Sequence, residues 1–251
     1  MKKAWYSKFV FLLYIFLHSC STTETAKAEE FLEGFLFQES GCYTLFGDKP
    51  ITSMLIFRGK MEDSSLEDLS SEALKTLAFV DYKTAENFEA WKKVSKKLHM
   101  HNFFFVDIPL QNDPTCSSVY FVNIEETKKV FEEYFDLFHA KLKISNWEIL
   151  LHELKKPNEN LWNVLFSDHY LAGLLYGFGQ ENIETFCRKD KNRIFSESFE
   201  DVASKRNFPI PIYAISKKDK TSSKYREQRE KIKKKYKSKR ILEVTLQTLE
   251  K

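Results

Sequence analysis

Apolar positions recur at helical spacing through much of the chain. Within residues 84–98, aromatic or aliphatic side chains fall at i, i+3, i+6 and i+10, as on one face of an amphipathic helix. Comparable patterns predict further helices over residues 26–37, 64–77, 125–142, 147–154, 161–178 and 181–189. Because it is the most apolar of these, the stretch 161–178 is expected to form the central helix of the core.

Shorter apolar runs predict strands. Residues 102–108 contain FFFVDI, a buried-strand pattern that Pro109 is expected to stop, and residues 117–124 form a second such run. Residues Gln111 to Pro114 between them are of types that are common in turns, so we expect a β-hairpin. The remaining candidate strands are 51–57, 208–215, which its prolines would place at a sheet edge, and 241–249. The segment GCYTLFGDKP, residues 41–50, has an aromatic, strand-like centre and ends in a turn. Together these elements predict an α+β fold, a helix-rich single domain with a small antiparallel sheet.

The first nineteen residues, MKKAWYSKFVFLLYIFLHS, have the organisation of an export signal. Lys2, Lys3 and Lys8 provide a positive region, and residues 9–17 are an unbroken run of nine apolar side chains. A bilayer-spanning helix needs about 20 apolar residues, so we do not expect this run to be a stable membrane anchor.

Leu17-His18-Ser19-Cys20 resembles the lipobox of bacterial lipoproteins. Leu17, Ser19 and Cys20 match the family pattern, whereas His18 stands where a small residue is usual. The resemblance implies cleavage between Ser19 and Cys20, a diacylglycerol on the Cys20 thiol, and acyl chains that hold the protein to a membrane. By the same resemblance, Ser21 after the cysteine favours the outer membrane of a cell envelope.

A second resemblance rests on GCYTLFGDKP and on LAGLLYGFGQEN, residues 171–182. Both are similar to segments of uncharacterised lipoproteins of chlamydia-related bacteria. This resemblance covers about a tenth of the chain and implies export alone. We therefore expect a signal peptide (1–19), an acylated cysteine with a polar tether (20–30), a globular α+β domain (31–216), a basic, helical segment (217–240) and a final strand or tail (241–251).

Charge is unevenly distributed along the chain. The formal net charge of +3 equals the three lysines of the signal, so the rest of the chain is neutral overall. Residues 217–240 nevertheless hold thirteen Lys and Arg against three acidic residues. The expected contacts with an anionic surface are Lys231, Lys233, Lys234, Lys235, Lys237, Lys239 and Arg240. This segment is either a solvated helical face or a contact for anionic lipid or envelope polymer. Nucleic acid is not expected as a partner, because no aromatic-rich binding motif accompanies the charge.

Few residues carry catalytic or metal-binding patterns. His99 and His101 could bind zinc if a third ligand came near, from Asp107, His152 or His169, but two solvent-facing histidines are the plainer interpretation. Neighbouring helical side chains point about 100° apart, so Ser167-Asp168-His169 cannot form a hydrolytic triad. Ser167 or Asp168 is instead expected to cap a helix that starts at His169.

The cysteines and glycines have structural explanations. With Cys20 acylated, Cys42, Cys116 and Cys187 remain, and in an oxidising compartment two of them could pair. The spacing of Gly173 and Gly177 allows another element to approach the helix closely, and Gly179 fits a helix C-cap.

No motif in the chain reaches catalytic specificity, and we expect no cofactor. The sequence therefore favours a membrane-anchored, non-enzymatic envelope protein that binds or scaffolds a partner. The alternative is a hydrolase or metal enzyme that uses the histidines or a cysteine.

Overall fold

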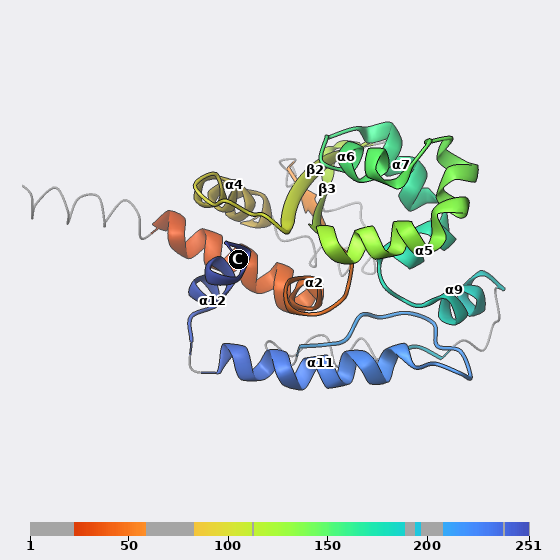
Figure 1. The fold of residues 1–251 in the computed structure, drawn as a ribbon. Helices are drawn as coiled ribbons and strands as arrows, with labels where there is room; N and C mark the ends of the chain where they lie inside the picture. The colour runs from red at the N-terminus through yellow and green to blue at the C-terminus, as the bar shows by residue number, and fades with distance from the viewer. Residues whose placement is uncertain are drawn as a thin grey trace, which may run out of the picture.

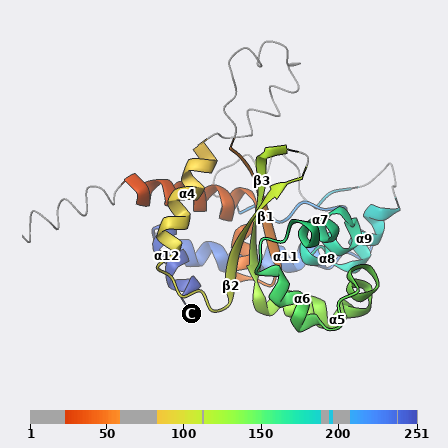
Figure 2. The same ribbon diagram turned by 90° about the horizontal axis from the view of Figure 1, so that it is seen from above.

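The computed structural model describes residues 23–58, 83–111, 113–188, 194–196, 208–237 and 239–250. Helices cover both faces of a small antiparallel sheet, so this part of the chain forms three layers (Figures 1 and 2). The expected helix-rich α+β fold is confirmed. The signal peptide, Cys20 and the helix expected over 64–77 lie outside the described residues.

The sheet has the strand order β1-β3-β2, with β1 spanning Ile51–Phe57, β2 Phe103–Leu110 and β3 Asp113–Asn123. β2 and β3 form the expected hairpin, in which Phe105 pairs with Phe121. The expectation that Pro109 ends β2 is wrong, since the strand continues through it to Leu110. Proline is tolerated because β2 is an edge strand and its pairing with β3 is irregular at this point.

One face of the sheet packs against the first and last helices described. Residues 23–33 form a helix that continues into the π-helix η1, Gly34–Gln38. This layer also contains α2 (Gly41–Phe46), α4 (Lys83–Ser95), α11 (Thr221–Tyr236) and α12 (Ile241–Leu249). Phe121 and Val119 of β3 belong to its apolar core, as the alternation of side chains along a strand requires.

The opposite face packs against five consecutive helices. They are α5 (Ile124–Leu142), α6 (Trp147–Leu154), α7 (Glu159–Ser167), α8 (His169–Leu175) and α9 (Gln180–Cys187). Tyr120 and Val122 point into this second core. Helices α5 to α8 each begin where an Asn or Asp side chain accepts a backbone N–H, the residues being Asn123, Asn146, Asn158 and Asp168.

Three sequence-based expectations for the local structure are wrong. The strand-like centre of GCYTLFGDKP is helix α2, whose residues from Gly41 to Leu45 are all buried. Residues 241–249 form α12 rather than a strand, because their buried positions follow a helical spacing. The single helix expected over 161–178 is two helices, since Asp168 leaves the helical conformation and caps α8.

Two more corrections concern the expected tether and the expected edge strand. The polar tether expected over residues 20–30 is helical from residue 23 onward, and Ala28 within it is fully buried. The edge strand expected over 208–215 does not join the sheet: among the described residues, its only bridge pairs Ala214 with Phe195. Its prolines lack the N–H groups that a strand ladder needs.

Candidate anion-binding site

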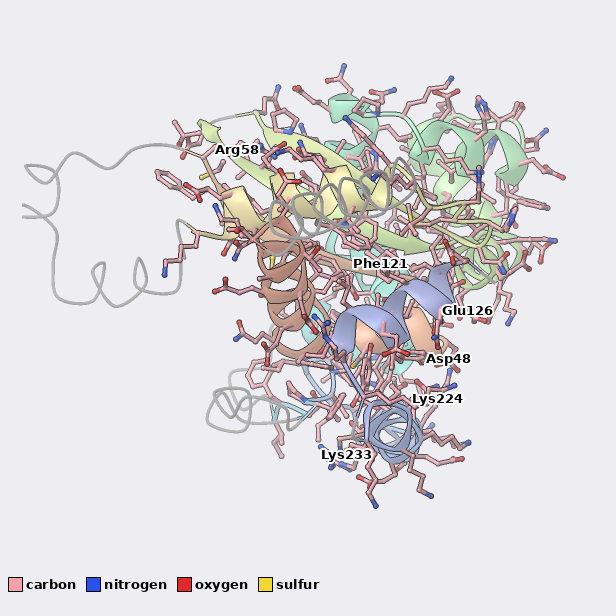
Figure 3. All side chains as sticks on the ribbon, turned by 90° about the vertical axis from the view of Figure 1, so that its left-hand side faces the viewer. Asp48, Arg58, Phe121, Glu126, Lys224 and Lys233 are labelled. Atoms are coloured by element: carbon pink, nitrogen blue, oxygen red, sulfur yellow. The ribbon has the colours of Figure 1, made fainter. Side chains whose placement is uncertain are left out.

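Helix α11 carries most of the basic segment and is helical as expected. Its buried residues, Ser222, Tyr225, Ile232 and Tyr236, form a single stripe along the helix. Asp48, in the turn before β1, holds this helix by accepting from Gln228 and pairing with Lys224. Seen along its axis in Figure 3, α11 lies at one edge of the body and turns charged side chains outward.

Part of the positive charge is neutralised within the molecule. Lys231 pairs with Glu227 at 2.6 Å, Lys233 with Glu230 at 3.2 Å, and Arg240 with Glu29 at 2.7 Å. Lys235 lies over the Phe46 ring, 5.0 Å from its centroid.

Lys234, Lys237 and Lys239 have no ion-pair partner within the part of the chain that the structure describes, and all three are exposed. Three of the seven lysine and arginine residues expected to contact an anionic surface are therefore fully available to an external anion. We call the end of α11 and the turn before α12, residues 233–240, the basic junction.

A cavity of about 430 Å³ opens beside the basic junction. Its apolar lining comes from distant parts of the chain: Phe37, Phe208, Tyr236 and Ile241. The ring of Phe37 lies edge-on to those of Phe208 and Tyr236, with centroids 4.7 and 5.2 Å apart. Such a floor offers no charge of its own and favours an apolar group.

Charged side chains surround this floor. Lys233, Lys234, Lys237 and Lys239 line the cavity together with Glu230. The lysines outnumber the one carboxylate, so the mouth of the cavity is positive. Sequence patterns indicated the lysines, but not the cavity, because its floor joins residues from three distant segments.

The backbone of Phe208 is held in a left-handed conformation, with φ of 50°. A bulky residue rarely adopts this region, and strain of about 1–3 kcal/mol is typical. Tyr43 donates from its hydroxyl to the Phe208 carbonyl at 2.9 Å, and Ser40 donates to the Pro209 carbonyl at 3.2 Å. These buried hydrogen bonds fix the turn and so position the Phe208 ring against Phe37.

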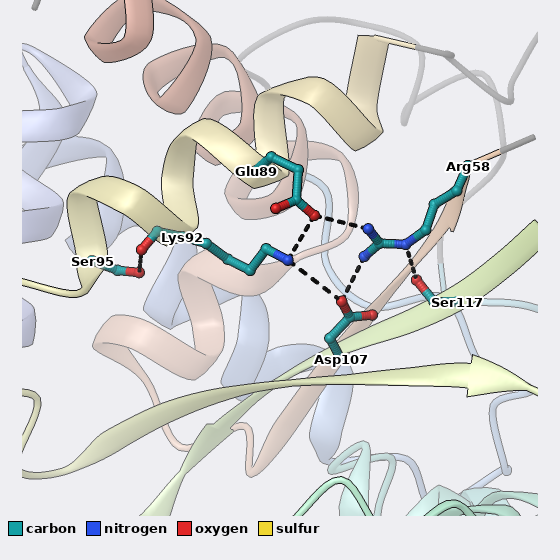
Figure 4. A network of polar contacts seen from close by, with 6 residues as sticks. All are labelled: Arg58, Glu89, Lys92, Ser95, Asp107 and Ser117. Carbon is teal, nitrogen blue, oxygen red and sulfur yellow. Dashed lines mark hydrogen bonds and ion pairs between the residues drawn. The ribbon is translucent and has the colours of Figure 1, made fainter.

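The histidine pair and its possible third ligands do not come together. His99 and His101 are exposed in the loop between α4 and β2. Asp107 is instead bound by Arg58 at 2.5 Å, in a network that also contains Glu89 and Lys92 and ties α4 to the sheet (Figure 4). Among the described residues, no group of three His, Cys, Asp or Glu side chains could hold a metal ion.

The three described cysteines are free and lie in three different elements. Cys42 is buried in α2, Cys116 is half-buried in β3 and Cys187 is exposed on α9, so the pairing considered from sequence does not occur among them. Burial raises the pKa of the Cys42 thiol well above its usual value, although Lys49 opposes the shift. A thiol in this state is a poor nucleophile.

The Ser-Asp-His triplet serves as a helix start, as expected. Asp168 accepts the N–H groups of Tyr170 and Leu171 at 3.0 and 3.2 Å and pairs with Lys141 at 2.9 Å. Partial burial works against ionisation, but these donors prevail and keep the pKa of Asp168 below its usual range.

Gly173 of α8 allows helix α9 to approach closely. A side chain at Gly173 would lie 2.6 Å from the Ile183 side chain of α9. The expectation that Gly179 caps the end of a helix is wrong: α8 ends at the C-cap Tyr176, which Gly177 follows with a φ of +72°, and Gly179 is the N-cap of α9.

Sequence patterns did not indicate the most unusual titratable group, Lys49. Its side chain is buried, and its ammonium group donates to Thr52 at 2.7 Å and lies 5.7 Å from the centroid of the Tyr176 ring. Burial lowers the pKa of Lys49 to about 7, against the attraction of Glu39. Thr52 is fully buried as well, so a substrate has no approach to this pair.

No helix in the described ranges is both long and apolar enough to cross a membrane. Comparison with protein-family models, with curated proteins and with solved structures gave no match.

Proposed function

We propose that this chain is a lipid-anchored envelope protein that holds its body against an anionic membrane surface through the basic junction. The proposal combines two features. The lipobox-like residues 17–20 supply the anchor, and the ion pair between Arg240 and Glu29 fastens the basic junction to the helix that follows the anchor. The proposed role is non-enzymatic, namely to bind or scaffold a partner at that surface.

The short stretch of sequence between Cys20 and Glu29 supports this proposal most directly. Helix 23–33 starts three residues after Cys20, and an extended chain spans at most about 3.6 Å per residue, or about 11 Å here. Six further residues at 1.5 Å each place Glu29 within about 20 Å of Cys20. In both views of the fold, the start of this helix and α12 lie on the same side of the body (Figures 1 and 2). An acylated Cys20 would therefore bring the basic junction to the bilayer.

Electrostatics would then strengthen the contact. Each Lys or Arg near an anionic surface is worth about 1 kcal/mol, within a screening distance of about 8–10 Å. Lys217, Lys218 and Lys220 precede α11 and so lie at its other end, about 24 Å along the helix axis from the junction. They carry the same charge but are too distant to share the contact, which makes them a matched control.

The anchor is tested in bacteria that express the full chain or its Cys20→Ser variant. We expect the parent to partition into a detergent phase and its first residue to carry acyl chains in a mass spectrum. An unmodified amino terminus, or equal partitioning of the two proteins, would refute the anchor.

The surface contact is tested by flotation with vesicles of neutral phospholipid that contain 30% anionic phospholipid. The protein is the chain from residue 20 with Cys20→Ser, which keeps every contact described above because all of them lie within residues 23–250. Changing Lys234, Lys237 and Lys239 to Gln should abolish most binding at low salt, whereas the same change at Lys217, Lys218 and Lys220 should leave it within two-fold. Equal losses in the two triple variants would refute the orientation.

A further inference from the structure

We infer that the cavity beside the basic junction binds one phosphate-bearing amphiphile, with its apolar part on the aromatic floor and its phosphate among Lys234, Lys237 and Lys239. This inference deepens the proposed function, on which it rests for the presence of such molecules at the site. The volume of about 430 Å³ is typical of small-molecule pockets and suits a single head group with the first part of an attached chain.

The aromatic floor favours contact with an apolar group of the ligand. Phe37, Phe208 and Tyr236 are each less than a tenth exposed, and the rings stabilise one another through edge-on contacts. The Tyr236 hydroxyl is within 3.4 Å of the Thr245 hydroxyl and is buried, so the floor presents carbon rather than a polar group. A purely ionic ligand would gain nothing from this surface.

The four lysines that line the cavity, Lys233, Lys234, Lys237 and Lys239, form its rim and favour an anionic head group. Lys233 has an internal carboxylate partner in Glu230, whereas the other three lysines of the rim have none in the described ranges. Three adjacent ammonium groups suit a multiply charged anion better than a single carboxylate, and lysine binds phosphate as a point charge without needing a fixed geometry.

The floor is also fixed in advance of binding. The left-handed backbone at Phe208 persists because Tyr43 and Ser40 hold the two carbonyls of this turn from α2 and its preceding residue. A wall that is already rigid loses little conformational freedom when a ligand arrives. The strained turn therefore has a use in the bound state that a simple loop connection would not require.

The test is calorimetric titration of the chain from residue 20 with Cys20→Ser, using octyl phosphate below its aggregation concentration and no membrane. Inorganic phosphate tests the head group alone, and octyl glucoside tests the chain alone. We expect octyl phosphate to bind at least ten-fold more tightly than either. The Gln variant of Lys234, Lys237 and Lys239 should lose at least ten-fold in affinity, and the Gln variant of Lys217, Lys218 and Lys220 less than two-fold.

Each outcome bears on a different part of the inference. Inorganic phosphate binding as tightly as octyl phosphate would overturn the role of the floor, and equal affinity of the two triple variants would overturn the role of the rim. Vesicle binding without any preference for octyl phosphate would overturn the pocket and leave the surface contact standing. Octyl phosphate binding without vesicle binding would support the pocket and refute the membrane orientation. Far-ultraviolet circular dichroism of each variant establishes that it is folded.

Discussion

Replacement of Lys49 by methionine should change how the stability of the protein depends on pH. Lys49 is buried, and burial lowers its pKa from 10.5 to about 7 in the folded state. Between these two values the unfolded chain binds a proton that the folded chain does not, so the free energy of unfolding rises with pH. At about 1.4 kcal/mol per pH unit, the full difference is of the order of 5 kcal/mol.

The pH dependence caused by Lys49 is easiest to measure above pH 7. From pH 7 to pH 8.5, titration of Lys49 should add about 1–2 kcal/mol to the free energy of unfolding. Well below pH 7, Lys49 is protonated in both states and adds no slope. Lys49→Met removes the ionisable group, keeps a similar length, and costs about 1 kcal/mol through the lost hydrogen bond to Thr52. The free-energy penalty of burying the amine is larger than this cost, and the variant no longer carries that penalty. The variant should therefore be more stable than the parent at pH 7.

Urea unfolding of both proteins at several pH values between 6 and 9 measures the effect. The difference between parent and variant should narrow steadily above pH 7, because Lys49 of the folded parent loses its proton there and the variant has no ammonium group to lose one. Lys220→Met is the matched control, since it removes an exposed ammonium group and should leave the slope of the parent unchanged. Parallel curves for the parent and Lys49→Met would refute the assignment of a buried amine that loses its proton near neutrality.

Three further outcomes follow from local geometry. Asp168→Ala should lower the free energy of unfolding by about 1 kcal/mol in urea titrations, because α8 loses its N-cap, and an unchanged value would contradict that role. Gly173→Ala should cost about 1–3 kcal/mol by overpacking against the γ-carbons of Ile183, and combined with Ile183→Ala, which removes those carbons, the total loss should be smaller than the sum of the two single losses. In the native protein a maleimide should label Cys187 rapidly and leave Cys42 unlabelled until the chain unfolds, which mass spectrometry after timed quenching detects.

The sequence predicted best those elements whose signals are local. The β2–β3 hairpin was found because turn residues separate two aromatic runs, and α6 because its apolar residues recur at helical spacing. Helix α12 was mistaken for a strand because ILEVTLQTL satisfies both periodicities over so short a length. Tertiary packing selects the helix over the strand, because Ile241, Val244 and Leu249 all enter the core shared with helix 23–33.

Sequence patterns predicted the lysines of the candidate site but not its cavity. A run of lysines is visible in any sequence, and helical spacing pairs Lys231 with Glu227 and Lys233 with Glu230, but the pair of Arg240 with Glu29 depends on the fold. The floor of the cavity joins Phe37 to Phe208, and no pattern within either segment indicates the other. Burial of Lys49 was hidden for the same reason, because a lysine in a turn before a strand is ordinarily exposed.

The meeting of helix 23–33 with α12 has a consequence for biogenesis. Phe31 and Leu32 reach their final surroundings only when Ile241 and Leu249 have been synthesised, more than two hundred residues later. Contacts so remote along the chain form slowly, and the half-built core cannot close around the earlier helix. This layer of the fold is therefore completed only after the last helix has been synthesised, whereas the core around α5 to α9 lies within residues 51–183 and can pack earlier.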